Sequence, residues 1–366
     1  MKTKRSKKPL KLHVQPKRPL PKVHTLRCDA HAPTSGYWDN SVPPVIRMKS
    51  GDIVEIETRT HLNGRMAPGA GITDWIRWYR KLIEETPETY TYPDPMTGVK
   101  KVKKGAAHHS LSGPVYVDGA EPGDALQIEI LDIIPSHHGF NLIPDTSLLK
   151  AGLLPDDFPK GMVKWYRVDR KKMKFQFLPG IEIPLKPFPG SIGLELPEKG
   201  MWSNVPPGRH GGNIDNKELT VGTILYLPVW VEGAGLKTGD SHWAQGHGEV
   251  DLNGLECGFK KMTLRLTVRK DLKDLVDWPM GSTPTHWITM GFHTDLLESC
   301  KMATRRAIKF LNRYYGLPEK EAYAFCSMAV DLYVTQAVDL ALGIHAMIPK
   351  TCFTGKRYLK KNKLLL

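Results

Sequence analysis

The chain has 366 residues, of which 40% are hydrophobic and 25% charged, a composition typical of globular proteins that excludes a largely disordered chain. Its net charge of +14 would indicate a nucleic-acid partner, but 15 of the 52 basic residues lie in residues 1–28 and 355–366, which contain no acidic residue. The remaining 37 basic residues are balanced by 38 acidic residues, so the net charge of the rest of the chain is close to zero.

The N-terminal segment, residues 1–26, is predicted to be an extended, partly disordered basic arm, because its four prolines prevent helix formation. We expect the arm to be solvated or to contact a neighbouring subunit. Binding to nucleic acid is the alternative, but no zinc-finger spacing or aromatic nucleic-acid motif accompanies the arm. Residues 356–366 form a second basic tail. The apolar core of a signal peptide and an apolar run of about 18 residues are both missing, so we expect a cytoplasmic protein with no membrane contact.

Strand signals dominate from about residue 40 to 270. Residues 51–57, 122–130 and 222–229 each alternate apolar and polar residues after a turn that contains glycine, and residues 258–268 add a fourth run. Alternation with a period of two is typical of half-buried strands. The recurrence indicates similar β-units stacked in one body.

Helical signals lie in three places. Residues 72–94 carry Trp75, Trp78 and Tyr79 at helical spacing, which predicts a short helix inserted between strands. Residues 294–315 and 318–343 each place apolar residues on one helical face, and Gly316 and Pro318 are expected to end the first helix and start the second. The predicted fold is therefore α+β: predominantly β-sandwich or barrel-like units with a C-terminal helix pair, within 290–345, packed on the β-body. One catalytic body is expected to span residues 27–355.

The most concentrated polar run is 239–249. It contains five potential ligands or proton carriers, namely Asp240, His242, Gln245, His247 and Glu249. On a strand, residues i and i+2 face the same side, so Asp240 and His242 could reach one ion together. A carboxylate with an imidazole suits Zn²⁺ or a similar transition ion. By composition alone, a polar glycine-rich surface loop is an equally good interpretation.

A second polar group is Arg209-His210-Gly211-Gly212-Asn213-Ile214-Asp215. The backbone N–H groups of Gly211 and Gly212 are candidates for oxyanion stabilisation. The side chains of His210 and Asp215 are candidate metal ligands. A turn with a capping asparagine explains the same residues as well.

The third group begins at His108-His109 and ends in a turn that contains Glu121. His109 and Glu121 are candidates for substrate contact. Turn chemistry alone accounts for the sequence that follows Glu121, so this group is the weakest of the three.

Together these groups resemble the acetamidase/formamidase family. The matching segments are 111–124, His210-Gly211-Gly212-Asn213-Ile214-Asp215, 239–249, Val334-Thr335-Gln336-Ala337-Val338-Asp339 and 343–350. They occur in one order with consistent spacing from about residue 40 to 350. The resemblance implies hydrolysis of a small linear amide such as formamide or acetamide to ammonia and a carboxylate, on a mostly β fold that tends to form homo-oligomers.

Two features depart from the family's pattern. The acidic residue that the family usually has between the glycines of the Gly-x-Gly-Glu element is His247 here, and segment 72–94 is longer than is typical. His247 therefore joins the catalytic candidates, and segment 72–94 is a candidate to line the pocket or to form a lid over it.

The predicted mechanism is hydrolysis assisted by a divalent metal, with Zn²⁺ as the expected ion. His210, Asp215, Asp240 and His242 are the candidate ligands, and Glu249 is the candidate general base. Gln245 and the Gly211–Gly212 backbone would hold the amide. The five scattered cysteines include no C-x-x-C pair, but Cys257 beside Glu256 leaves a cysteine-nucleophile amidase as one alternative. A non-enzymatic binding protein that uses the basic N-terminal arm is the other.

Overall fold

The computed structural model describes residues 20–28, 34–35, 37–85, 109–356 and 358–359. Residues 1–19 of the predicted basic arm and most of the predicted basic tail lie outside the described residues. The last four residues of the arm form strand β1 (Val23–Leu26), which pairs in parallel with β5 (Ile53–Ile56). The end of the arm is thus part of a sheet.

The first large sheet has nine strands in the order β1-β5-β18-β7-β15-β19-β20-β22-β21. The four strands predicted from alternation are confirmed, and they are neighbours in this sheet. Their bounds are β5 Ile53–Ile56, β7 Ala125–Pro135, β15 Ile224–Pro228 and β18 Phe259–Arg269. The other members are β19 Met280–Ser282, β20 His286–His293, β21 Asp331–Gln336 and β22 Leu342–Pro349.

The second large sheet has eleven strands. Its main path is β11-β10-β9-β8-β17-β16-β12-β14, and β6 joins it beside β16. The bounds are β6 Ser110–Asp118, β8 His138–Ile143, β9 Met162–Asp169, β10 Lys174–Leu178, β11 Ile181–Pro184, β12 Phe188–Gly193, β14 Gly211–Asn213, β16 Leu236–His242 and β17 Glu256–Cys257. Two short strands, β2 (Thr34–Ser35) and β4 (Ile46–Lys49), pair with the far side of β6, and β3 (Tyr37–Trp38) pairs separately with β13 (Trp202–Ser203).

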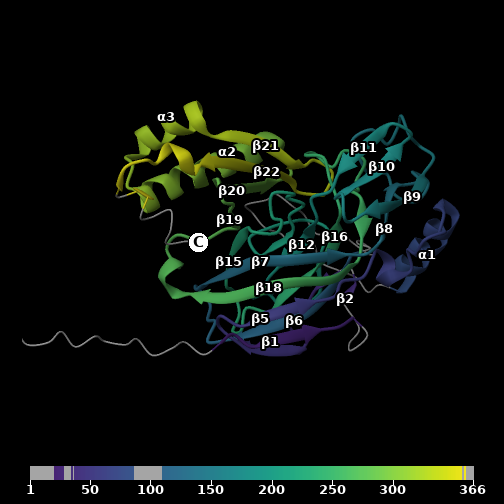
Figure 1. Ribbon diagram of the computed structural model, residues 1–366, viewed down its shortest axis with the longest axis horizontal. Coiled ribbons are helices and arrows are strands. Elements are labelled where there is room, and N and C mark those ends of the chain that lie inside the picture. Colours follow the sequence, from purple (N-terminus) through teal and green to yellow (C-terminus); the bar gives the residue numbers. More distant parts are fainter. Residues whose placement is uncertain (1–19, 29–33, 36, 86–108, 357, 360–366) are drawn as a thin grey trace, which may run out of the picture.

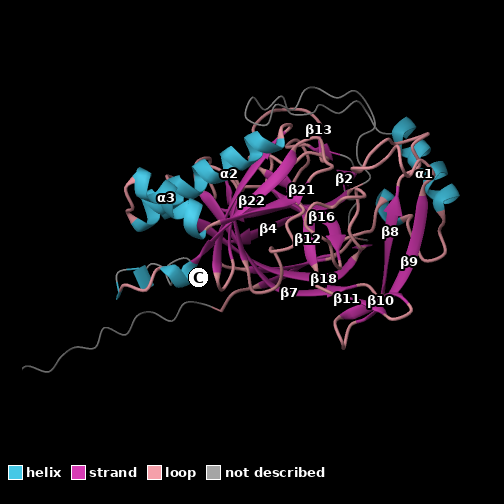
Figure 2. Cartoon of the chain, turned by 90° about the horizontal axis from the view of Figure 1, so that it is seen from above, coloured by secondary structure: helices cyan, strands magenta, loops and turns pink. Residues whose placement is uncertain are grey.

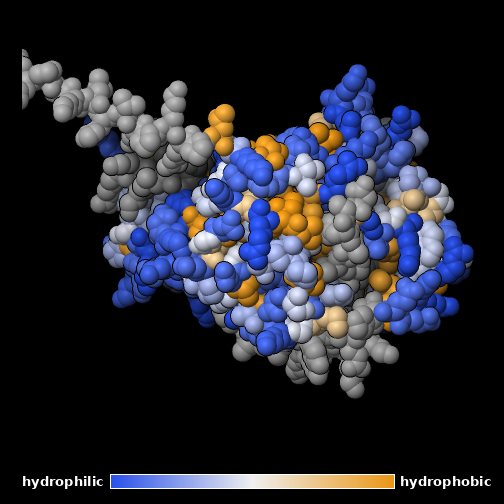
Figure 3. Space-filling model, turned by 90° about the horizontal axis from the view of Figure 1, so that it is seen from below, coloured by the Kyte–Doolittle hydropathy of each residue, from blue (hydrophilic) through white to orange (hydrophobic). Residues whose placement is uncertain are grey.

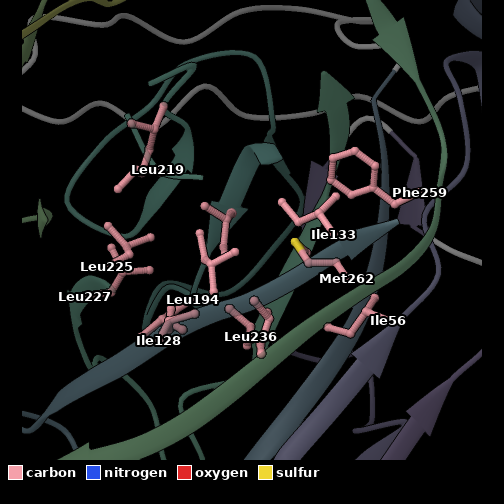
Figure 4. Packing of buried hydrophobic residues seen from close by; sticks show 14 of the residues in the cluster. Ile56, Ile128, Ile133, Leu194, Leu219, Leu225, Leu227, Leu236, Phe259 and Met262 are labelled. Atoms are coloured by element: carbon pink, nitrogen blue, oxygen red, sulfur yellow. The ribbon is translucent and has the colours of Figure 1, made fainter. Parts of the chain in front are cut away.

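The main hydrophobic core lies between these two sheets. Ile56, Ile128 and Met262 contribute from the first sheet, and Leu236 contributes from the second (Figure 4). All four side chains are fully or almost fully buried. Burial of a side chain of this size contributes about 1.5–3 kcal/mol, which explains why the inward positions of the strands are apolar. The arrangement is the sandwich-like body expected from the sequence.

Helices cover the two ends of this body (Figures 1 and 2). α2 (Leu296–Phe310) begins at the N-cap Asp295, whose carboxylate accepts hydrogen bonds from two backbone N–H groups, and it continues as a short π-helix to Tyr315. Gly316 then ends the helix in the left-handed conformation, as predicted. α3 (Glu319–Ala329) follows; α2 packs against β20 and β22, and α3 packs against α2 and β22.

The second C-terminal helix is shorter than the sequence pattern predicted. It ends at Ala329, and residues 331–336 form β21 at the edge of the first sheet. The prediction of a helix as far as residue 343 was wrong because the Leu-Tyr-Val-Thr segment also suits a strand, and pairing with β22 decides between the two. Asp339 follows this strand, and backbone hydrogen bonds between Gly248 and residues 335 and 337 place that segment beside the polar run 239–249.

At the opposite end, α1 (Ile72–Glu85) confirms the predicted helix over residues 72–85, while residues 86–94 lie outside the described part of the chain. Trp75 and Tyr79 stack at 5.0 Å between ring centroids and belong to a separate hydrophobic cluster with Phe140 and Leu142 of β8. α1 is therefore fixed by its own small core.

Hydrophilic side chains cover most of the described surface on the face shown in Figure 3, and the apolar ones gather in separate patches. Among the described helices, none combines the length and the apolar character that crossing a membrane requires.

One buried ion pair anchors β16, the strand that leads to the polar run. Lys237 Nζ lies 2.6 Å from Glu195 Oε1, and both side chains are essentially excluded from solvent. A buried charge that loses its partner is strongly destabilising, because nothing replaces the lost hydration.

We therefore expect Lys237→Met to lower the free energy of unfolding by about 3–5 kcal/mol. Replacing both partners, as Lys237→Met with Glu195→Met, should cost less than the single change. Lys301→Met, which breaks the exposed Lys301–Glu298 pair, is the matched control and should cost at most about 1 kcal/mol. Urea denaturation measures all three variants, and equal losses at positions 237 and 301 would contradict the role of the buried pair.

Candidate active site

The centre of the polar cluster is built on two paired strands. Asp240 and His242 lie at i and i+2 on β16, and β17 places Glu256 opposite His242. His242 Nε2 lies 3.5 Å from Asp240 Oδ1 and 3.2 Å from Glu256 Oε2. Asp240 and His242 face one point, and both offer ligand atoms to the same group.

Two more histidines approach Asp240 from other elements. His61 precedes the short helix η1 (Leu62–Gly64), and its Nε2 lies 3.0 Å from Asp240 Oδ1 and 3.1 Å from Glu256 Oε2. His109 precedes β6, and its Nε2 lies 3.7 Å from the same oxygen of Asp240. Asp240 is therefore the common neighbour of three imidazoles, all of them buried.

Three further carboxyl groups complete the cluster. Asp215 follows β14, Glu249 lies in the loop after β16, and Asp339 follows β21. Backbone hydrogen bonds of 3.1 and 3.0 Å from Gly248 to Thr335 and from Ala337 to Gly248 bring the last two segments together. Asn213 donates to Asp339 Oδ2 at 3.1 Å.

The backbone at three of these carboxylates is left-handed. Asp215, Asp240 and Glu249 have φ angles of 52°, 46° and 49°. Residues other than glycine rarely adopt this region, and each instance costs on the order of 1–3 kcal/mol. Its concentration at one cluster is the pattern expected of a functional site, where surrounding structure holds side chains in positions that local preference disfavours.

Gln245 orients His242 from the side away from the carboxylates. Its Oε1 lies 2.7 Å from His242 Nδ1, and its Nε2 donates to the backbone carbonyl of Asp215 at 3.0 Å. The second contact directs the amide oxygen toward the imidazole, so Nδ1 carries the proton and Nε2 is left for the carboxylates or for an ion.

Close packing leaves no room for a side chain beneath the cluster. A Cβ atom added to Gly190 of β12 would lie 2.5 Å from Asp215 Oδ1 and 2.7 Å from Asp240 Oδ2. A glycine at this position lets both carboxylates settle directly against the strand.

The imidazoles and their carboxylate neighbours stabilise each other's charge. Burial opposes charge on His61, but Glu256 and Asp240 raise its pKa to about 9, and the same two carboxylates raise the pKa of His242. Burial opposes the ionised form of Glu256 as well, yet His242 and His61 lower its pKa to about 2. Asp240 behaves in the same way, with its pKa lowered by His109 and His242.

The other three carboxyl groups lack such compensation. Burial raises the pKa of Asp215, and the neighbouring Asp240 and Asp339 raise it further. Burial and then Asp215 raise the pKa of Glu249. Burial raises the pKa of Asp339 to about 7. This side of the cluster therefore holds negative charge poorly and favours either bound protons or a cation.

The cluster opens onto a cavity of about 480 Å³. The polar residues that line it are His61, His109, Asn213, Asp240, Glu249, Glu256 and Asp339. They form the floor of the cavity. Tyr79 and Ile83 of α1 line another part, so the predicted role of this segment in lining the pocket agrees with its position.

Five residues predicted from the sequence thus come together: His109, Asp215, Asp240, His242 and Glu249, with Gln245 supporting His242. Others lie elsewhere. The ring of His210 packs edge-on against Trp38 at 5.1 Å, and burial lowers its pKa to about 3. The N–H of Gly211 donates to the Gly208 carbonyl at 3.0 Å, and Gly212 pairs with Ile192 of β12.

Two more candidates are displaced from the cavity. Glu121 lies on the surface and pairs with Lys270 at 2.9 Å. His247 lines a second cavity of about 500 Å³. There its Nε2 lies 3.6 Å from Glu218 Oε1, and its ring lies 4.8 Å from that of His345. Because Gly246 and Gly248 reverse the chain, His247 and Glu249 face different cavities.

Sequence reasoning missed His61, Glu256 and Asp339 as site residues. His61 is an isolated histidine with no motif around it, and Glu256 is a single acid before a cysteine. Asp339 ends a segment that matched the family, which was the one available signal. Their roles depend on distant segments meeting.

Cys257, the alternative nucleophile, lies in the main core with its side chain buried. Burial and the adjacent Glu256 raise the pKa of its thiol well above the usual range. This environment disfavours the thiolate that a nucleophilic cysteine needs.

Comparison of the chain with known proteins identifies its family. The acetamidase/formamidase family model matches residues 94–204 and 198–355. A formamidase from Methylophilus methylotrophus is 27% identical, with 87% of this chain and 86% of the relative covered. An acetamidase from Mycolicibacterium smegmatis is 26% identical over 63% of this chain and 64% of the relative.

A solved structure agrees. The acetamidase from Bacillus halodurans superposes with a TM-score of 0.74 and 28% identity, covering 90% of this chain and 98% of that chain. The family model spans well over half of the sequence and includes every residue of the polar floor except His61. The chain therefore belongs to the acetamidase/formamidase family and is an amidohydrolase that acts on a non-peptide C–N bond.

Proposed function

We propose that the protein hydrolyses a linear amide to ammonia and a carboxylate with the help of a divalent metal ion at Asp240. The observation that carries this proposal is the meeting of three imidazoles and five carboxyl groups in one buried cluster, part of which forms the floor of a cavity. Such a donor set of nitrogen and oxygen atoms suits Zn²⁺ or a similar transition ion.

The residues present fit a cation. Three groups of donors have their ligand atoms within 4.8 Å of one another: His61 with His109 and Asp240, Asp240 with His242 and Glu256, and Asp215 with His242 and Glu249. Among the described residues, nothing donates a hydrogen bond to the buried Oε2 of Glu249. The floor, as described, includes no lysine or arginine that could compensate these carboxylates. A bound cation would supply the missing positive charge.

The group that faces the substrate is His61, His109 and Asp240. All three line the cavity, whereas His242 and Asp215 lie behind it. A catalytic ion needs an open coordination position, so we assign these three as its ligands with Glu256 beside them. When bound there, the ion would polarise the amide carbonyl and make a nearby water more acidic.

Glu249 is the proposed proton carrier. Its carboxylate accepts a proton from the water whose oxygen bonds to the carbonyl carbon, and the proton then passes to the amide nitrogen as the C–N bond breaks. The amide R–CO–NH₂ and one water give R–COOH and NH₃, which ionise to the carboxylate and ammonium near neutral pH. The raised pKa of Glu249 suits a group that must both accept and return a proton.

Removal of metal tests the proposal most directly. We expect protein stripped by a chelator to lose ammonia release from acetamide and to regain it when Zn²⁺ is restored. Zn²⁺ at 100 times its dissociation constant should also stabilise the fold by about 2.7 kcal/mol, seen as a rise in Tm, and His109→Ala should weaken this effect. Full activity in rigorously metal-free protein would refute the assignment.

Glu249→Gln should lower kcat roughly 10²–10⁴-fold, because the amide cannot carry the proton. Metal content by atomic emission should stay unchanged, since a fall would show Glu249 to be a ligand and not the base. The matched control is Glu121→Gln, which alters an exposed glutamate outside the cavity and should leave turnover intact.

Gln245→Ala should lower metal affinity and kcat/KM roughly 10–100-fold, because it frees His242, whose Nε2 lies 3.5 Å from the assigned ligand Asp240, and so loosens that carboxylate. Titration with a chromophoric chelator measures the affinity separately from turnover. Gln176→Ala on the exposed face of β10 serves as the control, and a matching loss in both variants would remove the positioning role.

A further inference from the structure

The cavity above the polar floor is larger than the smallest amides require. Its volume of about 480 Å³ lies within the range of roughly 300–1,000 Å³ typical of pockets for drug-sized ligands. Acetamide consists only of a methyl, a carbonyl and an amino group. Much of the cavity would still hold water with acetamide on the floor.

The walls of the cavity are apolar, in contrast to its floor. The apolar lining residues are Tyr79, Ile83, Leu148, Leu149, Leu252, Val338 and Leu340, together with Val205 and two alanines. Most come from α1, from the loop after β8, and from the segments that carry Glu249 and Asp339, while Val205 comes from the loop after β13. Of the described lining residues outside the floor, Lys150 is the charged one, and it pairs with Asp156 at 2.7 Å.

The walls are held in fixed relation to the floor. The backbone N–H groups of Leu148 and Leu149 both donate to the Asp145 carbonyl at 3.0 Å. The N–H of Leu153 donates to the Val250 carbonyl at 2.9 Å, which ties this loop to the residue after Glu249. Leu148 and Leu149 also pack against the small hydrophobic cluster of α1.

We propose that the substrate is a primary amide with a branched alkyl or aryl-substituted acyl group, and that this whole acyl group is about the size of phenylacetyl. This inference rests on the proposed function, since it places the amide on the metal-binding floor. The departing nitrogen must reach the carboxyl groups of Glu249 and Asp339, so it lies on the floor. The apolar substituent, on the other side of the carbonyl, then lies against the leucine and tyrosine walls, where burial favours binding.

The test is a panel of primary amides that share the leaving group: formamide, acetamide, isobutyramide and phenylacetamide. We measure ammonia release from each with the metal-loaded wild-type enzyme. One extra methylene in an apolar pocket typically changes kcat/KM about 10–200-fold, so kcat/KM for phenylacetamide should exceed that for acetamide at least tenfold. In Leu149→Ala the ratio of these two kcat/KM values should fall about tenfold, mainly through KM.

Leu297→Ala removes an exposed leucine on α2 that does not line the cavity, and it should leave both values unchanged. If formamide and acetamide are hydrolysed while phenylacetamide is neither cleaved nor inhibitory, the substrate class is overturned and the proposed function stands. If no amide of either size is hydrolysed by the metal-loaded enzyme, the proposed function fails and this inference fails with it. A ratio that stays constant in Leu149→Ala would also overturn the inference.

Discussion

The burial of charge at Asp240 is the constraint around which the rest of the structure is arranged. Three imidazoles and five carboxyl groups lie in the interior, where an unpaired charge is expensive. His61 and His242 compensate Asp240 and Glu256, as the opposite shifts of their pKa values show. Asp215, Glu249 and Asp339 remain in excess, and the proposed metal ion would offset their charge.

The fold satisfies this constraint because the ends of several short segments meet at one place. Strands β16 and β17 bring their side chains together through register, while His61, His109, Asp215 and Asp339 each lie at the edge of an element. Asp215 and Glu249 adopt the left-handed conformation outside the strands, whereas Asp240 adopts it within β16 and interrupts the regular strand geometry there. Burial of apolar side chains in the large core between the two sheets stabilises the fold and offsets the free-energy cost of this backbone strain and of the buried charges.

The cavity combines this polar floor with walls that derive from the insertion at α1 and from the loop after β8. The floor holds the groups proposed to carry out hydrolysis, and the walls are proposed to select the acyl group. His247 lies outside this division, because it faces a second cavity with Glu218 and His345. The departure from the family's usual residue at that position therefore concerns a different pocket from the one where hydrolysis is proposed.

The sequence alone determined the elements with strong periodicity and the parts of the site that are local. Alternation identified the four strands of the first sheet, and helical spacing with Gly316 identified α2. The i and i+2 relation of Asp240 and His242 follows from strand geometry. Only the tertiary structure decided that residues 331–336 form an edge strand, that His61, Glu256 and Asp339 join the site, and that His247 and Glu249 separate. The reason is physical: periodicity reports which face of one element is buried, whereas the meeting of side chains from distant segments depends on strand order, register and backbone reversals that no local pattern records.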